Sequence, residues 1–445
     1  MKYTQLTEAQ IESMLATIGV DTIDDLFAPI PQEHRLDRLL NLAPGLSEPE
    51  LLADLSKLAA KNRGCDRQVC FLGAGAYDHF IPTIVDHLAT KGEFLTAYTP
   101  YQAEASQGSL QAFYEFQTMV CQLTGMDVAN ASLYEQSTAV AEAVLMARSD
   151  TRRRRVVVSD TVHPDTRAVL TTYTAEMKMD RVGVQHAGGV TDLHALGDVV
   201  NDQTAAVVIQ SPNFFGCLEP VERVAEAARQ VGAALIVSID PIGCGVLKTP
   251  GSLGADIVVA EGQPLGIPLA YGGPYLGLMA CRQKYLRKMP GRVVGRGQDV
   301  AGREAFCLAL QTREQHIRRE RATSNVCTNQ GLMALRAAIY LSAMGKQGLE
   351  QVAAQCLDKA HYAADRIVAL DGYRLRFDQP FFKEFTVQSA RPVSKVLARC
   401  RDQGILAGVT LGRWYEELSD CFTLAVTERR TKPQIDDLVA ALASV

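Results

Sequence analysis

The sequence predicts an α/β protein whose main domain is a largely parallel β-sheet with helices on both faces. Short, nearly all-apolar runs alternate with amphipathic helical stretches from about residue 69 onward, and this alternation is typical of strands buried on both sides of a parallel sheet. Polar residues directly follow several of these runs, at the carboxyl ends where open α/β sheets bind ligands. A smaller α+β domain is expected after the main one.

The elements of the main domain follow from these patterns. The predicted strands are Val69–Leu72, Val156–Ser159, Ala205–Gln210, Ala233–Ile239, Asp256–Ala260 and Tyr275–Ala280. Apolar residues at helical spacing predict helices at Gly108–Leu123, Ser137–Ala147 and Val221–Val231. The polar strand exits are Ser159-Asp160, Ser211-Pro212-Asn213 and Asp240-Pro241.

The two ends of the chain have a different character, which predicts an arm at 1–65, the main domain at 66–313 and a small domain at 314–445. In the arm, helices are expected around Ile11–Ile18 and at Glu48–Ala60. In the small domain, Thr323, Ser324 and Asn325 offer N-caps for a long helix from Val326 to about Met344. Two strands, Glu384–Gln388 and Cys421–Thr427, and a helix at Thr431–Ala443 capped by Thr431 complete the prediction.

Composition excludes several function classes. The chain has 445 residues and a net charge of −5, so no overall attraction to nucleic acid or an anionic membrane is expected. The basic block Arg152–Arg155 precedes an apolar run and is interpreted as a solvated helix end and strand start. The sequence shows no signal peptide, no apolar stretch long enough to span a bilayer, and no zinc-site spacing among its 11 cysteines. A reducing compartment, the cytoplasm, is therefore expected.

The strand at Val69–Leu72 is followed by a glycine turn with two interpretations. Phe71–Tyr77 reads FLGAGAY and contains Gly-x-Gly. A dinucleotide site would require a third glycine and a helix opening there, whereas Asp78 and then Pro82 follow. A tight backbone turn is the better interpretation.

A second loop has the layout of a pyridoxal-phosphate (PLP) site without its lysine. Asp240 ends an apolar strand, where PLP enzymes place the partner of the pyridine nitrogen, although a turn aspartate before Pro241 explains it equally well. The strand at Asp256–Ala260 then runs into Glu261-Gly262-Gln263-Pro264, and none of these residues has the amine that an aldimine requires. Lys248 and Lys284 lie away from this strand exit. No GxSxG or catalytic histidine motif offers another chemistry.

The richest polar stretch is Thr96–Gly108, TAYTPYQAEASQG. It is either an exposed loop that caps the next helix or a loop that lines a site or subunit interface. Tyrosine rings for contact and Gln and Glu side chains for directional hydrogen bonds favour the second interpretation.

Four motifs carry a family resemblance over nearly the whole chain: FLGAGAYDHFIPTIV, the stretch beginning TAYTPYQAEASQG, TREQHIRRERATSNVCTNQ and GRWYEEL. They resemble the glycine decarboxylase P-proteins of the glycine cleavage system, and within them the α subunit found where the P-protein is split into two chains. The resemblance implies a PLP-dependent fold type I architecture. It also implies a second, related subunit that carries the PLP lysine in a His-Lys dipeptide.

Set beside that second subunit, this chain departs from the family pattern twice. Gln263 or Pro264 falls at the lysine position, depending on a one-residue gap. The glycine-rich phosphate cup corresponds here to Glu135-Gln136-Ser137-Thr138, which is bulkier and negatively charged. His163 and Asp240 keep positions similar to cofactor-side residues, as remnants or structural groups. The resemblance therefore implies a degenerate site at His163, Asp240, Gln263, Pro264, Ser137 and Thr138.

The activity that the resemblance implies belongs to an assembled heteromer. Such an enzyme decarboxylates glycine through PLP and passes the aminomethyl group to the lipoyl arm of the H-protein, in association with the T- and L-proteins. Catalytic groups and PLP are expected on the second subunit. The residues expected to contact the partner near its site are Tyr98, Tyr101, Gln102, Glu104, Gln107, Arg318, Arg319, Thr323, Ser324 and Asn325. The last three are also explained as helix caps, and a helix N-terminus suits a phosphate.

Two rival hypotheses stay open at this point. The chain could be a scaffold or regulatory pseudo-subunit that only stabilises the PLP-bearing subunit. It could also be a self-sufficient PLP enzyme that uses an unusual lysine.

Overall fold

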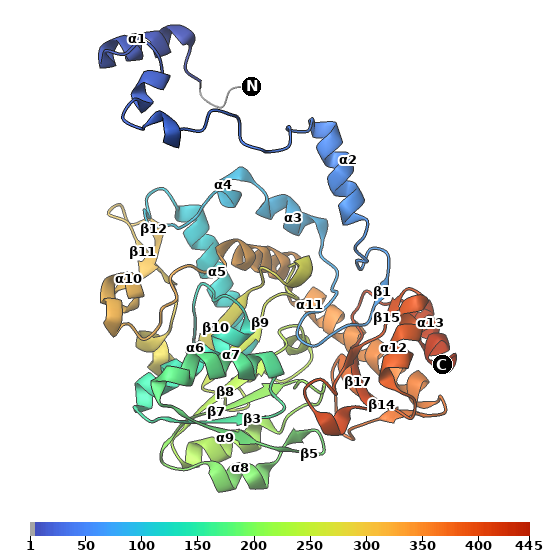
Figure 1. Cartoon of the computed structure of the whole chain (residues 1–445). Helices are drawn as coiled ribbons and strands as arrows, with labels where there is room; N and C mark the ends of the chain where they lie inside the picture. The colour runs from blue at the N-terminus through green and yellow to red at the C-terminus, as the bar shows by residue number, and fades with distance from the viewer. Residues whose placement is uncertain (1–4) are drawn as a thin grey trace. The chain divides into compact units, whose positions relative to one another are not determined.

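A computed structural model describes residues 5–445 (Figure 1). The chain forms two compact units, one up to Arg63 and the other from Gly64 to Val445. In the first, α1 (Glu8–Ile18) and α2 (Glu48–Ala59) each begin with a capping box, formed by Thr7 with Gln10 and by Ser47 with Glu50. Short 3-10 turns, η1 (Asp24–Phe27) and η2 (Gln32–His34), lie between them. Both predicted helices are confirmed, and the predicted domain limits at residues 65 and 313 stay predictions.

The second unit is built on a seven-stranded sheet, and the predicted largely parallel sheet is confirmed. Its strands lie in the order β2 (Val128–Ala129), β10 (Gly277–Cys281), β9 (Ile257–Glu261), β8 (Ala234–Ile239), β7 (Thr204–Ser211), β3 (Arg155–Ser159) and β4 (Asp180–Val184). From β9 to β4 all neighbours are parallel, whereas β10 runs antiparallel to β9 and β2.

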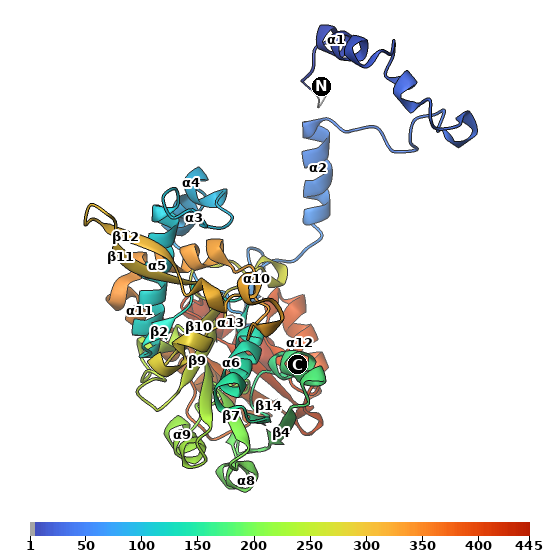
Figure 2. The same ribbon diagram turned by 90° about the vertical axis from the view of Figure 1, so that its left-hand side faces the viewer.

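Successive residues of the central strands alternate between two apolar cores. In β7, Val207 and Ile209 pack in the core shared by α5 (Gln107–Thr124) and α9 (Val221–Gln230), while Ala206 and Val208 pack against α6 (Gln136–Thr151). Because side chains point to opposite faces along a strand, this sorting requires both faces of the sheet to be covered (Figure 2). Every residue of β8 and β9 is therefore buried.

Besides α5, α6 and α9, which pack on the sheet, this unit contains α3 (Thr83–Ala89), α4 (Gly92–Leu95), α7 (Pro164–Thr174), α8 (Leu193–Val199) and α10 (Gln315–Arg318). Of these, α8 packs on the edge strand β4, α7 on α6, and α3 on the long helix α11 (Gly331–Val368). Two hairpins project from it, β5 (His186–Ala187) with β6 (Val190–Thr191), and β11 (Val293–Gln298) with β12 (Glu304–Ala309). Within the described residues, no helix has the length and apolar character needed to cross a membrane.

The C-terminal part forms a second, four-stranded sheet with its own apolar core. Its order is β13 (Tyr373–Leu375), β14 (Glu384–Ser389), β17 (Cys421–Ala425) and β16 (Val409–Thr410). The long helix α11 (Gly331–Val368), interrupted at Gly345, joins this core to the first, and α12 (Val393–Asp402) and α13 (Lys432–Ala443) complete it. Thr431 caps α13 as predicted.

Two local predictions are wrong. Val69–Leu72 does not enter the main sheet, because only Val69–Cys70 is extended as β1 and it pairs with β15 (Ile405–Leu406). The long helix begins at Gly331, and Thr323, Ser324 and Asn325 do not cap it. The Ser324 hydroxyl instead accepts the Val326 N–H, which closes a local turn, and Arg292 binds the Cys327 carbonyl and the Asn329 side chain.

The sequence also missed β2, β4 and the β11–β12 hairpin. β4 reads DRVGV and keeps two charged residues, so it lacks the apolar run by which the other parallel strands were found. The glycine turn after β1 is confirmed, since Ala74 and Gly75 both have positive φ values, of 60° and 102°.

Candidate functional site

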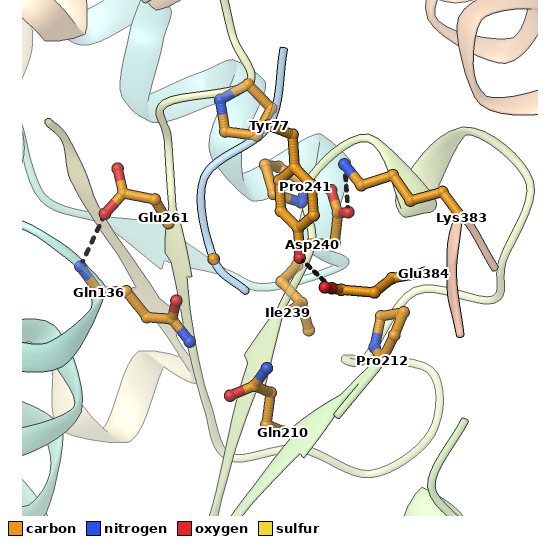
Figure 3. Close-up of a pocket in the computed structure, with 12 residues that line it drawn as sticks. Tyr77, Gln136, Gln210, Pro212, Ile239, Asp240, Pro241, Glu261, Lys383 and Glu384 are labelled. Carbon is orange, nitrogen blue, oxygen red and sulfur yellow. Dashed lines mark hydrogen bonds and ion pairs between the residues drawn. The ribbon is translucent and has the colours of Figure 1, made fainter. Parts of the chain in front are cut away.

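A small polar cavity lies where the carboxyl ends of β8 and β9 meet the start of α6 and of β14 (Figure 3). Its walls include Tyr77, Asp240, Glu261, Lys383 and Glu384. The volume is only about 20 Å³, which is room for about one water molecule. We call this space the inner cavity.

Asp240 does not face an open pocket, because a lysine side chain is bound to it. Lys383 Nζ lies 2.6 Å from Asp240 Oδ2, and both side chains are nine-tenths or more buried. The other carboxylate oxygen accepts the Ile242 N–H at 3.0 Å. Asp240 therefore makes the turn contact that one of its two interpretations expects, and its other carboxylate oxygen binds Lys383.

The Lys383 ammonium has two further neighbours. It lies 2.8 Å from His79 Nε2 and 3.7 Å from the centre of the Tyr77 ring. Burial, together with the Lys383 charge, lowers the pKa of His79. A neutral His79 accepts from Lys383 at Nε2 and donates from Nδ1 to Glu428 Oε2, 2.6 Å away. The result is a continuous chain of Asp240, Lys383, His79 and Glu428.

His79, Glu428 and Cys356 bring three atoms able to bind a metal within 4.8 Å of one another. These three side chains form hydrogen bonds within the chain and do not form a metal site. Both ring nitrogens of His79 are engaged, one by the Lys383 ammonium, and a cation in this position repels a second cation. This cluster is a polar network between the two sheets.

The other end of the inner cavity is occupied by Glu261. One carboxylate oxygen accepts the N–H groups of Gln263 and Leu276, both at 3.0 Å, and the other accepts the Gln136 N–H at 3.2 Å. Burial raises the pKa of Glu261 to about 7, against these hydrogen bonds. Gln136 is the first residue of α6, so a carboxylate lies at the positive end of a helix dipole.

The predicted phosphate-cup residues cap the same helix. Glu135 is the N-cap of α6, and its carboxylate accepts the Thr138 N–H at 2.9 Å. The Thr138 hydroxyl donates to the same carboxylate, and the Ser137 hydroxyl lies 2.9 Å from that of Thr166. The acidic side chain expected at this position is present, and Glu261 adds a second carboxyl group whose pKa burial raises to about 7.

The side chains at the predicted lysine position bind the chain's own backbone. Gln263 accepts the Tyr77 N–H at 2.9 Å and donates to the carbonyls of Tyr77 and Ile267. Pro264 lines the inner cavity. Gln263 thus attaches the β9 exit to the turn that follows β1, and neither residue carries an amine.

That turn is shaped by Glu384. The Ala74 N–H donates to Glu384 at 2.7 Å, and the Tyr77 hydroxyl donates to it at 2.7 Å. A Cβ on Gly73 would lie 2.2 Å from the same carboxylate, so only glycine fits there. His163 supports the turn from outside the cavity, with Nε2 3.0 Å from the Ala74 carbonyl and its ring against Phe214.

These residues do not fit PLP. The aspartate that would pair with the pyridine nitrogen is bound to Lys383, the first backbone N–H of the helix that would receive the phosphate is bound to Glu261, and the remaining volume is about 20 Å³. Lys383 is not a substitute Schiff-base lysine, because its amine sits at Asp240, the place of the ring nitrogen, and not at the strand exit after β9.

A second region gathers the residues predicted to contact a partner. Tyr98 is 81% exposed and Tyr101 is 58% exposed. Gln102, Glu104, Arg318 and Arg319 are also exposed. We call these six residues the rim.

The structure brings the two sequence stretches of the rim together. The Tyr98 hydroxyl lies 3.4 Å from Thr328, and the Tyr101 ring meets His316 edge to face. Arg292 lies against Tyr101 and binds Thr99 and Asn329. Arg319 has a φ of 54°, a backbone conformation that is strained for residues other than glycine.

Of the other residues predicted to contact a partner, some already bind groups of this chain. Gln107 exchanges two hydrogen bonds with the Phe306 backbone and holds β12 on α5. Thr323 and Ser324 are half-buried and Asn325 is exposed. Glu142 is a buried residue of α6, and burial raises its pKa to about 7.

The sequence reasoning missed Lys383, His79, Glu261 and Arg292 as site residues. The sequence does contain a signal for Lys383, because Lys383 and Glu384 interrupt the apolar stretch PFFKEFTV. Charged residues in such a stretch are buried only when they are paired. For Arg292 we find no sequence signal.

Comparison with known proteins gives consistent matches along the whole chain. The family model described as glycine cleavage system P-protein matches residues 1–442. The chain is 49% identical over 445 residues to a probable glycine dehydrogenase (decarboxylating) subunit 1 of Desulforamulus reducens, covering 100% of each chain. It is 51% identical over 447 residues to the protein of the same name from Chlorobium chlorochromatii, again covering 100% of each.

Solved structures agree. A glycine decarboxylase (P-protein) of the glycine cleavage system, crystallised with an inhibitor, superimposes with a TM-score of 0.92, 41% identity and 100% coverage of both chains. Glutamate decarboxylase of Lactobacillus brevis, at 14% identity and a TM-score of 0.71 over 94% of this chain and 96% of the other, shares the fold alone. The predicted fold class is confirmed.

Proposed function

Because the chain belongs to the glycine cleavage system P-protein family, we propose that it is the subunit of a two-chain glycine decarboxylase that holds no PLP. The PLP is bound covalently by a lysine of the second subunit. The observation that carries this proposal is the inner cavity, which is closed at one end by Lys383 on Asp240 and at the other by Glu261 on α6. The name "subunit 1" of the relatives supports the existence of a second chain.

In the assembled enzyme, PLP supplies the electron sink for decarboxylation of glycine. The aminomethyl group then passes to the lipoyl arm of the H-protein, and the T- and L-proteins act with the complex. This chain contributes the surface that completes the site of the second subunit. The exposed aromatic and charged side chains of the rim support that role, because such groups anchor protein interfaces. The 11 unpaired cysteines support a location in the cytoplasm.

Two measurements test the proposal. The isolated chain mixed with PLP is expected to show no internal-aldimine absorbance and no borohydride-stable adduct at a single lysine. A stoichiometric adduct confined to one specific lysine of this chain would contradict it, whereas scattered labelling of exposed lysines would not. The chain co-expressed with its second subunit is expected to catalyse glycine–CO2 exchange that neither chain catalyses alone.

A scaffold that contributes nothing to the partner's site is the second candidate function, and the closed inner cavity favours it as well. The two candidates differ at the rim. Tyr101→Ala in the intact heteromer lowers the exchange rate if the rim completes the site, and leaves it unchanged if the chain is a scaffold.

A further inference from the structure

The inner cavity has two charged ends, and each is neutralised by a side chain from a distant part of the sequence. At the β8 end, the Asp240 carboxylate faces the Lys383 ammonium. At the α6 end, the helix N-terminus faces the Glu261 carboxylate. A pocket for a phosphorylated pyridine needs an acidic group for the ring nitrogen and a helix N-terminus for the phosphate. Both elements remain here, and both already have partners.

The position of Lys383 in the fold explains how it reaches Asp240. It directly precedes β14, and the isolated bridge between Cys217 and Phe381 fixes the approach of this segment to the loop that follows β7. Its side chain is 2% exposed and its ammonium touches Asp240, His79 and the Tyr77 ring. A buried ammonium is costly unless it is paired, so Lys383 and Asp240 depend on each other.

Glu261 accounts for the other partner. Its carboxylate accepts three backbone N–H groups, from Gln136, Gln263 and Leu276. Several converging N–H donors form an anion site of the kind that binds phosphate. Without Glu261 these buried donors would have no acceptor, which is unfavourable.

We propose that the inner cavity is a cofactor pocket filled from within, in which the Lys383 ammonium and the Glu261 carboxylate take the places of a cationic ring nitrogen and a phosphate. Each side chain therefore covers a subsite for a small ion of its own charge. Truncation of either side chain uncovers that subsite and only that one. The inference concerns the folding of this chain and goes beyond the question of which subunit carries PLP.

The test is rescue of truncated variants of the full chain by small ions, read out as the thermal unfolding midpoint. Lys383→Ala removes a propylammonium group, and loss of one member of a buried pair is expected to lower the midpoint by about 5 °C. Propylammonium chloride is expected to restore at least half of that loss. Neither 1-propanol, which has a similar size and no charge, nor KCl at equal ionic strength should do so.

Glu261→Ala provides the mirror experiment. It removes a carboxymethyl group, and sodium acetate at pH 8 is expected to restore the midpoint, whereas acetamide and NaCl are not. The two rescues should not cross, so acetate has no effect on Lys383→Ala and propylammonium has none on Glu261→Ala. Lys248→Ala is the control, because Lys248 pairs with Glu222 at 3.6 Å with both side chains largely exposed; its midpoint should change by about 1 °C or less and respond to neither ion.

The proposal is overturned if both truncations leave the midpoint unchanged, or if the neutral analogues rescue as well as the ions. If Lys383→Ala does not fold, the wild-type chain still gives a result. Reductive labelling of the native protein with PLP and borohydride should modify exposed lysines and leave Lys383 unmodified until the chain is unfolded. Labelling of Lys383 in the native state would overturn the proposal.

Discussion

The inner cavity and the rim are both rich in polar side chains, and they differ in where those side chains find partners. In the inner cavity, Asp240, Lys383 and Glu261 are buried and bind groups of the same chain. At the rim, Tyr98 and Tyr101 expose 81% and 58% of their surface to solvent. Groups satisfied internally stabilise the fold, whereas exposed aromatic and charged groups are available to another molecule. Polar side chains that stabilise the fold can therefore be distinguished from polar side chains that are free to contact another molecule.

The largest effect is expected from a substitution that disrupts the ion pair of the inner cavity. Asp240→Asn leaves the Lys383 ammonium buried without its counter-charge and should lower the free energy of unfolding by about 3–5 kcal/mol in denaturant titrations. Glu304→Gln is the matched control on the hairpin near the rim, because its partner Arg296 lies 3.3 Å away with both side chains more than half exposed. Its cost should be below about 1 kcal/mol. Equal losses in the two variants would remove the distinction between the regions.

The next effect is a pH dependence from Glu142, a buried residue of α6. Burial raises its pKa from 4.5 to about 7. A carboxyl with a raised folded-state pKa stabilises the fold fully below pH 4.5, and that contribution is lost as the pH rises through 7. The loss should reach about 3 kcal/mol.

Glu142→Gln should remove this part of the pH dependence of unfolding. The exposed Glu176→Gln serves as the control and should leave the wild-type slope intact. A Glu142→Gln variant with the full wild-type slope between pH 5 and pH 7 would show that Glu142 is not the responsible group.

A smaller effect tests the rim directly. Tyr98→Ala should lower glycine–CO2 exchange of the co-expressed heteromer about tenfold, equivalent to about 1.4 kcal/mol, because an exposed aromatic anchor is removed. Stability of the isolated chain should change by less than about 0.5 kcal/mol. Tyr98→Phe keeps the ring and should retain most of the activity. A stable complex with unchanged exchange would identify the chain as a scaffold.

The smallest effect comes from the strained backbone at Arg319. With φ at 54° and ψ at −127°, this residue adopts a conformation that glycine tolerates better. Arg319→Gly should therefore raise the free energy of unfolding by up to about 1 kcal/mol while it weakens assembly with the second subunit. Arg318→Gly, where φ is −81°, is the control and should destabilise slightly. A loss of stability at Arg319 would show that its conformation is not strained.

The sheet could be predicted from sequence because its physics is local. Each of β7, β8 and β9 is a largely apolar run between turn residues, as expected for strands buried on both faces, and Ser238 in β8 is a buried polar exception. β4 failed the same test because Asp180 and Arg181 begin it. The long helix was placed too early because Ser324 has the residue type of an N-cap, although its hydroxyl closes a turn instead.

Sequence alone predicts only some of the residues that form the inner cavity. Asp240 and the missing lysine at Gln263 were visible, since both lie next to predicted strands. The partners were not, because Lys383 reaches Asp240 across 143 positions of sequence, as the difference 383 − 240 shows. Glu261 was read as a loop residue, and its bond to Gln136 depends on how β9 and α6 pack. Long-range charge pairing leaves no spacing pattern in a single sequence.

The Lys383–Asp240 pair also has a consequence for how the protein is made. A chain that binds a small molecule only when folded becomes more stable as that molecule becomes abundant. This chain already has its own ammonium at Asp240 and its own carboxylate at α6, so under the proposal made above its folding should not depend on the supply of vitamin B6.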